Sequence, residues 1–355
     1  MSLQSNIPLL FLLIFSGALF FSALINNLLL NFSKNLGTRK SEGVQIRWSA
    51  TSKPALGGIS FYVVFLISFV CLQFILGNTA EYLSDKKTFG ILSSISIAFI
   101  MGLADDAYDT KPLLKFLTQF FCALILLITG TKIECFDSEF LNYTLTILWV
   151  VGMMNSINML DNMDAITTIV SIAAIGFITI LSVLQSQALS PLPILSVAML
   201  GALVGFLIYN WHPSKMFMGD TGSQFLGIFL AVIGIEYCWD IKPFQEEQFP
   251  LAYGSKSILV IASTFIIPLS DTVTVVINRT SKGQSPFVGG KDHTTHNLFF
   301  RGVTEKKIAV LYFLISAVGC FLSYQIIADH EWNLTKFWIY SVFPILIFST
   351  LFLLT

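Results

Sequence analysis

Residues 216–223, Met216-Phe217-Met218-Gly219-Asp220-Thr221-Gly222-Ser223, form a short polar segment between two long apolar runs. Residues 191–211 before it and 224–238 after it are almost wholly apolar. A carboxylate with hydroxyl and glycine neighbours at such a junction is typical of a site where a hard cation or a phosphate meets the backbone, because Mg²⁺ binds carboxylates together with substrate phosphates. The alternative is a simple helix cap, with Asp220 or Thr221 in the N-cap position.

The composition places the chain among polytopic membrane proteins. Hydrophobic residues make up 55% of the 355 residues, charged residues only 12%, and the mean hydropathy is +0.76. A soluble domain carries about 25% charged residues. In a membrane protein the formal net charge of −1 says little about binding partners, and we expect no nucleic-acid partner.

Apolar stretches of about 20 residues, the length of one membrane crossing, recur along the whole chain. We therefore expect an all-α polytopic membrane protein with about eleven transmembrane helices in a single integral-membrane domain, residues 1–355. The first stretch lacks a basic start and a cleavage pattern, so it is interpreted as a span and not as a signal peptide. The predicted spans are 7–30, 55–76, 89–104, 113–130, 143–160, 164–185, 191–211, 222–238, 256–278, 308–328 and 335–354.

The basic residues predict the orientation of the chain in the membrane. Loops after the odd-numbered spans carry fourteen of the 20 Lys and Arg residues, and the other side carries six. Since cytoplasmic loops are enriched in Lys and Arg, we expect the N-terminus outside and the C-terminus in the cytoplasm.

Four polar segments interrupt the apolar pattern, and all four fall on the predicted cytoplasmic side. They are 105–109, 155–164, Asp220 and 291–296, whereas the acidic residues of the outer loops are scattered. This asymmetry indicates one catalytic surface, an active site on the cytoplasmic face.

Structural interpretations exist for the first two segments. Asp105 and Asp106 could mark the membrane boundary, but adjacent carboxylates repel each other unless a cation joins them, and Lys111 or Lys115 could supply that charge. Asn155, Asn158 and Asp161 recur at intervals of three, which places them on one stripe of a helix. Polar groups on such a span face a bundle interior or a cavity, and the alternative is hydrogen bonding between helices.

His293 and His296 lie in a predicted cytoplasmic loop, 279–307. A long loop in a protein whose other loops are short is usually functional. No third imidazole or thiolate lies nearby to complete a zinc site, so phosphate binding or proton handling is favoured. For Asp271, which lies in an apolar run, we expect a structural role through a contact with Arg279 or a polar helix.

The five cysteines show no metal-binding spacing. A Cys135–Cys238 bridge on the outer side is only weakly indicated.

Five motifs resemble the polyprenyl-phosphate N-acetylhexosamine-1-phosphate transferase family, of the glycosyltransferase family 4 type, and they follow one another along the chain in the family's order. Residues 102–106 (GLADD) resemble its Asp-Asp motif, and residues 155–164 (NSINMLDNMD) resemble its Asn-x-x-Asn-x-x-Asp-Gly-x-Asp-Gly motif. Residues 217–223 match its Phe-x-Gly-Asp-Thr-Gly-Ser almost letter for letter. Residues 54–58 (PALGG) and 268–272 (PLSDT) also recur in the family. The resemblance spans nearly the whole chain.

The resemblance implies an enzyme that joins a sugar 1-phosphate from a UDP-sugar to a polyprenyl phosphate and releases UMP. The implied partners are a UDP-N-acetylhexosamine, undecaprenyl phosphate and the lipid bilayer, and the implied cofactor is Mg²⁺, with Mn²⁺ as a substitute. The implied location is the bacterial cytoplasmic (inner) membrane. A homodimer is left open.

The resemblance also assigns roles to individual residues. The implied metal ligands are Asp220, Asn158 and Asp106. The implied catalytic residues are Asp105, Asp106, Asp220 and His293. The implied substrate-binding residues are Lys53, Lys115, Asn155, Asp161, Asp164, Lys291 and His296.

Departures from the family pattern narrow the function. Asn162 and Ala165 replace glycines that are usual in the second motif. Residues 292–296 read DHTTH, whereas a triple-histidine run belongs to the muramoyl-pentapeptide branch. We therefore expect the branch that starts O-antigen, teichoic acid or similar surface glycans, most simply from UDP-GlcNAc. The pentapeptide transferase of peptidoglycan synthesis is the nearer alternative. An ion-coupled transporter is the more distant one, since transporters hold such groups near the bilayer midplane.

Overall fold

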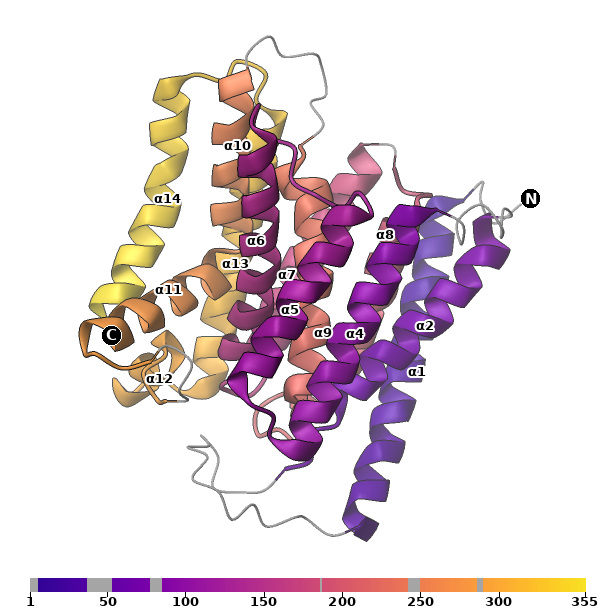
Figure 1. Ribbon diagram of the computed structural model, residues 1–355. Coiled ribbons are helices and arrows are strands. Elements are labelled where there is room, and N and C mark those ends of the chain that lie inside the picture. The colour runs from indigo at the N-terminus through magenta and orange to yellow at the C-terminus, as the bar shows by residue number, and fades with distance from the viewer. Residues whose placement is uncertain (1–5, 37–52, 77–84, 186, 242–249, 286–289) are drawn as a thin grey trace.

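The protein is a bundle of helices (Figure 1). The computed structural model describes residues 6–36, 53–76, 85–185, 187–241, 250–285 and 290–355. The elements are α1 (Ile7–Leu36), α2 (Gly57–Leu76), α4 (Lys86–Tyr108), α5 (Pro112–Ile128), α6 (Glu139–Leu160), α7 (Ile166–Leu184), α8 (Pro191–Asn210), α9 (Gly219–Gly234), the π-helical turn η2 (Ile235–Trp239), α10 (Pro250–Thr264), α11 (Ile266–Ser281), α12 (Thr294–Phe300), α13 (Glu305–Ala328) and α14 (Leu334–Leu353).

The multi-span architecture expected from the sequence is confirmed. Among the described residues, eight helices are long and apolar enough to cross a membrane, or nine if the bent pair α10–α11 is one span. Two shorter apolar helices, Gly57–Leu72 and Pro112–Ile128, cover the second and fourth predicted spans. Each predicted span is thus helical over most of its length. The number of crossings and the orientation stay predictions.

The ninth predicted span, 256–278, is wrong as a single straight helix. The chain breaks at Phe265, and the segments Gly254–Thr264 and Ile266–Ser281 meet at 85°. Pro268 explains the break, because proline donates no backbone hydrogen bond and its ring clashes with the carbonyl four residues earlier. Helix α11 therefore turns aside toward α12 (Figure 1).

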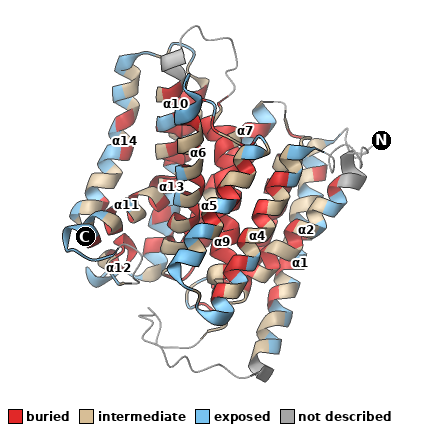
Figure 2. Cartoon of the chain, in the orientation of Figure 1, coloured by how far each residue is buried: buried red, intermediate tan, exposed pale blue. Residues whose placement is uncertain are grey.

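Helix α9 forms the centre of the bundle. In its most apolar window 94% of the residues are buried, whereas the corresponding windows of α1 and α14 are only 17% buried. Figure 2 shows the buried residues concentrated in the middle of the bundle and exposed ones along the outer helices. The outer helices carry large exposed apolar side chains such as Phe20 and Ile339, which suit contact with lipid tails.

One end of the bundle collects the polar segments. The C-terminal ends of α4 and α6, the N-terminal end of α9 and the short helix α12 lie at the same end, and α1 begins at the opposite end (Figure 1). Part of the predicted loop 279–307, residues 286–289, lies outside the described residues. All five cysteines are within the described residues and are unpaired, so the weakly indicated Cys135–Cys238 bridge is not formed.

Candidate active site

A backbone pairing joins the Pro54–Gly58 motif to the segment that precedes α9. The N–H groups of Gly57 and Gly58 donate to the carbonyls of Phe217 and Met218 at 3.1 and 3.0 Å. A Cβ on Gly58 would lie 2.1 Å from the backbone nitrogen of Gly222, so only glycine permits this approach. Two motifs far apart in sequence therefore fix the position of the α9 N-terminus together.

Asp106 caps helix α9 from a different helix. Its Oδ1 accepts the backbone N–H of Asp220 at 2.9 Å, and its Oδ2 accepts the backbone N–H and the hydroxyl of Thr221 at 2.8 and 2.6 Å. The simpler capping interpretation, with Asp220 or Thr221 as the N-cap, is wrong, because Met218 occupies the N-cap position without a side-chain bond. The first turn of α9 thus depends on α4.

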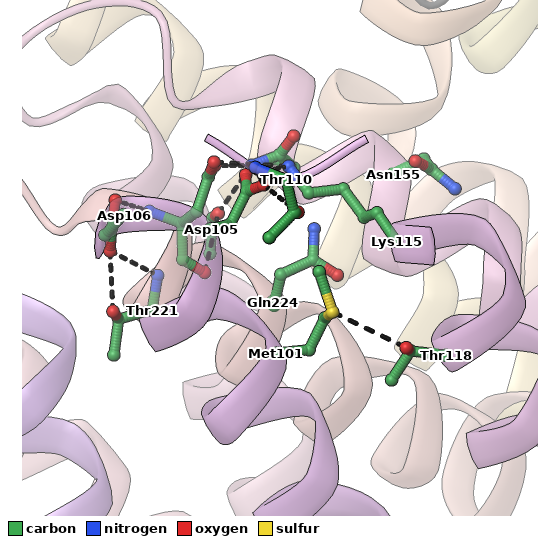
Figure 3. A network of polar contacts seen from close by, with 12 residues as sticks. Met101, Asp105, Asp106, Thr110, Lys115, Thr118, Asn155, Thr221 and Gln224 are labelled. Atoms are coloured by element: carbon green, nitrogen blue, oxygen red, sulfur yellow. Dashed lines mark hydrogen bonds and ion pairs between the residues drawn. The ribbon is translucent and has the colours of Figure 1, made fainter. Parts of the chain in front are cut away.

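Asp105, Lys115 and Asp220 form a charged cluster, and Figure 3 shows Asp105 and Lys115 side by side. The ammonium Nζ of Lys115 lies 2.6 Å from Oδ2 of Asp105 and 3.2 Å from Oδ2 of Asp220. The other oxygen of Asp105 accepts the backbone N–H of Thr110 at 3.0 Å and also contacts the hydroxyl of Thr110. Lys115 therefore offsets the charge of Asp105 and Asp220. The sequence left Lys111 and Lys115 open as the cation that joins Asp105 to Asp106, and Asp106 contacts α9 instead.

Asn158 completes a set of oxygen-bearing side chains around Asp220. Its amide nitrogen donates to Oδ1 of Asp220 and to the hydroxyl of Ser223 at 2.8 Å. Carboxylate, amide and hydroxyl oxygens are the ligand types that Mg²⁺ prefers. The side chains around Asp220 therefore include the oxygen types that suit the implied metal, but Asn158 faces Asp220 with its amide nitrogen and would have to turn its Oδ1 toward an ion. Ser223 lies within the recognised motif, but the sequence assigned it no role.

Asn155 takes part in a chain of amides between helices. Its amide nitrogen donates to Oε1 of Gln119 at 2.7 Å, and Gln119 in turn donates to Gln224 at 3.0 Å. This is the helix–helix interaction that the sequence left open as the alternative for Asn155. The substrate-binding role of Asn155 stays a prediction.

Asp164 and Lys53 form part of a second polar cluster. Asp164 accepts the backbone N–H and the hydroxyl of Ser214 at 2.9 and 2.7 Å, and Lys53 lies 3.5 Å away. Burial works to raise the pKa of Asp164, but the bonds from Ser214 and the charge of Lys53 outweigh it and lower that pKa. Lys53 also lies over the ring of Phe217, 5.0 Å from its centre. These two predicted substrate-binding residues are therefore together.

His212 and Glu305 belong to the same cluster, and the sequence analysis missed both. Nδ1 of His212 lies 3.1 Å from Oδ2 of Asp164 and 2.9 Å from Oε2 of Glu305. The ligand atoms of the three residues lie within 4.8 Å of one another, so they could also hold a metal ion. Neither residue lies in a motif, and only the fold brings the start of α13 to the loop before α9.

Asp161 lies at the end of α6, close to the carboxylates of both clusters. Burial, followed by the negative charges of Asp220, Asp106 and Asp164, raises the pKa of Asp161 to about 8. The Asp161 carboxyl therefore holds its proton more strongly than a free aspartic acid does.

The histidine segment is organised by Asp271. Nδ1 of His293 lies 2.8 Å from Oδ2 of Asp271, and Oδ1 of Asp271 accepts the backbone N–H and the hydroxyl of Thr294 at 2.8 and 2.6 Å. Of the two partners expected for Asp271, Arg279 is not the one found, because Asp271 contacts His293 and the start of α12. Arg279 binds both oxygens of Asp292, at 2.7 and 2.6 Å.

The remaining predicted residues of this segment differ in exposure. His296 is buried, and burial together with the nearby His293 lowers the pKa of His296 to about 4. Lys291 is exposed. Burial works to raise the pKa of Asp292, but the bound guanidinium of Arg279 outweighs it and lowers that pKa.

One hydrogen bond ties the histidine segment to the carboxylate clusters. The hydroxyl of Thr295 in α12 donates to Oδ1 of Asn162 at 2.6 Å, and Asn162 follows Asp161 directly. Asn162 occupies a position where the family pattern has glycine, so in this chain its side chain supplies a contact that glycine lacks.

Sequence comparison finds a known family in the middle of the chain. Residues 88–237 match the sequence profile described as glycosyl transferase family 4. This region, less than half of the chain, is similar to members of that family. The matched region contains Asp105, Asn158 and Asp220, and the resemblance deduced from the motifs is confirmed.

Relatives of the family 4 region include named transferases. A probable undecaprenyl-phosphate N-acetylglucosaminyl 1-phosphate transferase of Bacillus subtilis is 26% identical over 75% of this chain and 71% of its own length. A decaprenyl-phosphate N-acetylglucosaminephosphotransferase of Mycobacterium leprae is 25% identical over 76% of this chain and 72% of its own. A phospho-N-acetylmuramoyl-pentapeptide-transferase of Streptococcus agalactiae is 30% identical, but over only 56% of this chain and 64% of its own.

Proposed function

We propose that the protein transfers N-acetylglucosamine 1-phosphate from UDP-GlcNAc to undecaprenyl phosphate, releases UMP and thereby starts a lipid-linked surface glycan such as O-antigen or teichoic acid. The site would face the cytoplasm at the inner membrane of a bacterium. The observation that carries the proposal is the Asp105–Lys115–Asp220–Asn158 cluster at one end of the bundle. The choice of sugar is supported by the two relatives named for N-acetylglucosamine transfer, which cover about three quarters of this chain.

Magnesium is part of the proposal. Asp220 and Asn158 would hold the ion through carboxylate and amide oxygens, once the amide of Asn158 turns its oxygen in place of the nitrogen that now donates to Asp220. Bound there, Mg²⁺ would neutralise the negative charge of the donor's pyrophosphate. Mn²⁺ would be able to take the place of Mg²⁺. Asp106 as a further ligand would have to keep its three hydrogen bonds to α9, so its contribution would come from the remaining lone pairs.

The chain's own residues would bring two polyanions together. Lys115 lies between two carboxylates and would turn toward a phosphate when the donor or the lipid arrives. Asp105 would then be released to orient or deprotonate the lipid phosphate. Lys53 and Asp164, held together beside Phe217, would bind the nucleotide. A site at the end of the bundle allows the lipid to present its phosphate from the membrane.

The test is UMP release by purified protein in detergent with undecaprenyl phosphate and Mg²⁺. The donors to compare are UDP-GlcNAc, UDP-GalNAc and UDP-MurNAc-pentapeptide, with Asp220→Asn as the matched variant. We expect release from UDP-GlcNAc that is lost on chelation and in the variant. Release from the pentapeptide donor alone would show that the peptidoglycan alternative is right. No release from any donor by folded protein would overturn the proposal and favour the transporter.

A further inference from the structure

The contact between Asp271 and His293 is the best-defined polar contact that the proposed chemistry does not use. Asp271 is fully buried and His293 is 6% exposed. Oδ1 of Asp271 already accepts two hydrogen bonds from Thr294, and the hydroxyl of Tyr312 supports Thr294 in turn, at 2.7 Å. Oδ2 remains for Nδ1 of His293 at 2.8 Å.

These contacts fix which ring nitrogen of His293 carries a proton. An ionised carboxylate only accepts hydrogen bonds, so Nδ1 must be the donor. The other ring nitrogen, Nε2, is then the one polar atom of the ring left for a ligand. A carboxylate that fixes a histidine in this way determines its orientation and its tautomer.

The frame that carries this pair is attached to the helix of the carboxylate site. The hydroxyl of Ser156 in α6 donates to the carbonyl of Pro268 at 2.6 Å, and the hydroxyl of Thr272 donates to Ser156 at 2.8 Å. Ser156 lies two residues before Asn158. The hydrogen bond from Thr295 to Asn162 attaches α12 to the end of the same helix. Helix α11 and helix α12 are therefore both held to α6.

We infer that Asp271 is a positioning residue for His293. Asp271 accepts the hydrogen bond from Nδ1–H of His293, and Nε2 is left as the ring atom that contacts a substrate phosphate. The sequence suggested a structural role for Asp271, and the break at Phe265 explains how Asp271 reaches His293. Because α11 turns through 85°, Asp271 comes to lie against the start of α12. The assignment of a phosphate as the ligand of Nε2 rests on the proposed function.

The substitution Asp271→Asn tests the inference with almost no change in shape. The two donors of Thr294 will keep the amide oxygen at the position of Oδ1. The amide NH₂ must then face Nδ1 of His293, which becomes an acceptor, and the proton moves to Nε2. The control is Tyr312→Phe, which removes one supporting hydroxyl but leaves the carboxylate on the ring.

Nitrogen-15 NMR of histidine-labelled full-length protein reads the tautomer directly, since the chain has only four histidines. His293→Gln identifies the signal. We expect Nδ1 of His293 to stay protonated from acid to alkaline pH in the parent and in Tyr312→Phe, and to lose its proton at alkaline pH in Asp271→Asn. An unprotonated Nδ1 in the parent would overturn the inference, whatever the activity.

Kinetics test the second half of the inference. We expect kcat of Asp271→Asn to fall on the order of 10²-fold, the size of a lost proton-transfer or phosphate contact, with little change in KM for UDP-GlcNAc. Tyr312→Phe should keep its kcat. Unchanged kcat in Asp271→Asn despite the altered tautomer would overturn the positioning role. If no variant or parent transfers any sugar, the proposed function fails while the NMR result stands by itself.

Discussion

Asp106 and Thr221 lie on different helices, and two hydrogen bonds join them at 2.8 and 2.6 Å. Both bonds end on the same carboxylate oxygen, while the other oxygen accepts the N–H of Asp220. The negative charge lies at the N-terminus of α9, where the helix dipole favours it. Asp106, the residue after Asp105, therefore holds Asp220 in place by accepting its backbone N–H.

We expect Asp106→Asn to lower the free energy of unfolding by about 1 kcal/mol, the net contribution of one hydrogen bond at this partly exposed helix start. The amide has only one oxygen, so either Asp220 or Thr221 loses its partner. Thermal unfolding in detergent with chelator measures the loss. The control is Asp109→Asn, at an exposed position with φ of 52° that asparagine tolerates. Equal stability of Asp106→Asn and the parent would contradict the capping role.

We expect Gly102→Ala to separate α4 from α9. The new Cβ would lie 2.3 Å from the carbonyl oxygen of Asp220, a backbone atom that cannot turn aside. Such overpacking costs about 1–3 kcal/mol. The matched control is Gly152→Ala in α6, where no heavy atom lies within 4 Å of the new Cβ. That change should stabilise the helix by about 1 kcal/mol. Melting temperature and UMP release measure the effect, and we expect both to fall in Gly102→Ala but not in Gly152→Ala. Equal values in the two variants would contradict the close approach of α4 and α9.

We expect Ala165→Gly to stabilise the protein. Ala165 has φ of 67°, in the left-handed region that costs a residue with a Cβ about 1–2 kcal/mol. Part of this gain is offset by the greater freedom of glycine in the unfolded chain. The control Ala174→Gly, inside helix α7, should destabilise by about 1 kcal/mol. Lower stability of Ala165→Gly than of the parent would mean that the methyl group contributes more than the backbone strain costs.

The pH dependence of stability should reveal Asp161. Its pKa is raised to about 8 in the folded protein, so between about pH 4 and pH 8 the folded state binds more protons than the unfolded state. Asp161 therefore contributes a loss of stability as the pH rises through this range. Asp161→Asn removes that contribution, so the stability of the variant relative to the parent should grow from pH 5 to pH 8 with chelator present. A constant difference would contradict the raised pKa.

Much of the fold and the gathering of the site could be predicted from the sequence. Apolar runs of membrane length and polar segments on alternate loops suffice to bring Asp105, Asn158 and Asp220 to one end of a bundle. A lysine beside Asp105 was also expected, because adjacent carboxylates repel each other, but the sequence did not choose between Lys111 and Lys115. Nor did it predict that Lys115 would also reach Asp220.

Other contacts could not be predicted, because they depend on where separate helices meet. The capping of α9 by Asp106, the partner of Asp271 and the place of Glu305 all join segments with no local signal in common. The bend at Phe265 could not be predicted because the segments before and after it form one continuous apolar run in the sequence. Only the ring of Pro268 indicated a break, and proline within a span is also compatible with a continuous helix.

The pairing between the Pro54–Gly58 segment and Phe217–Met218 has a consequence for the order of assembly. The chain is made from its N-terminus, so the paired groups of Gly57 and Gly58 must wait until helices α4 to α8 have been synthesised and inserted. Until then those backbone groups need water or another partner at the membrane surface. The site therefore closes late in biogenesis, and a nascent chain that stops before Phe217 would hold every earlier motif without an organised centre.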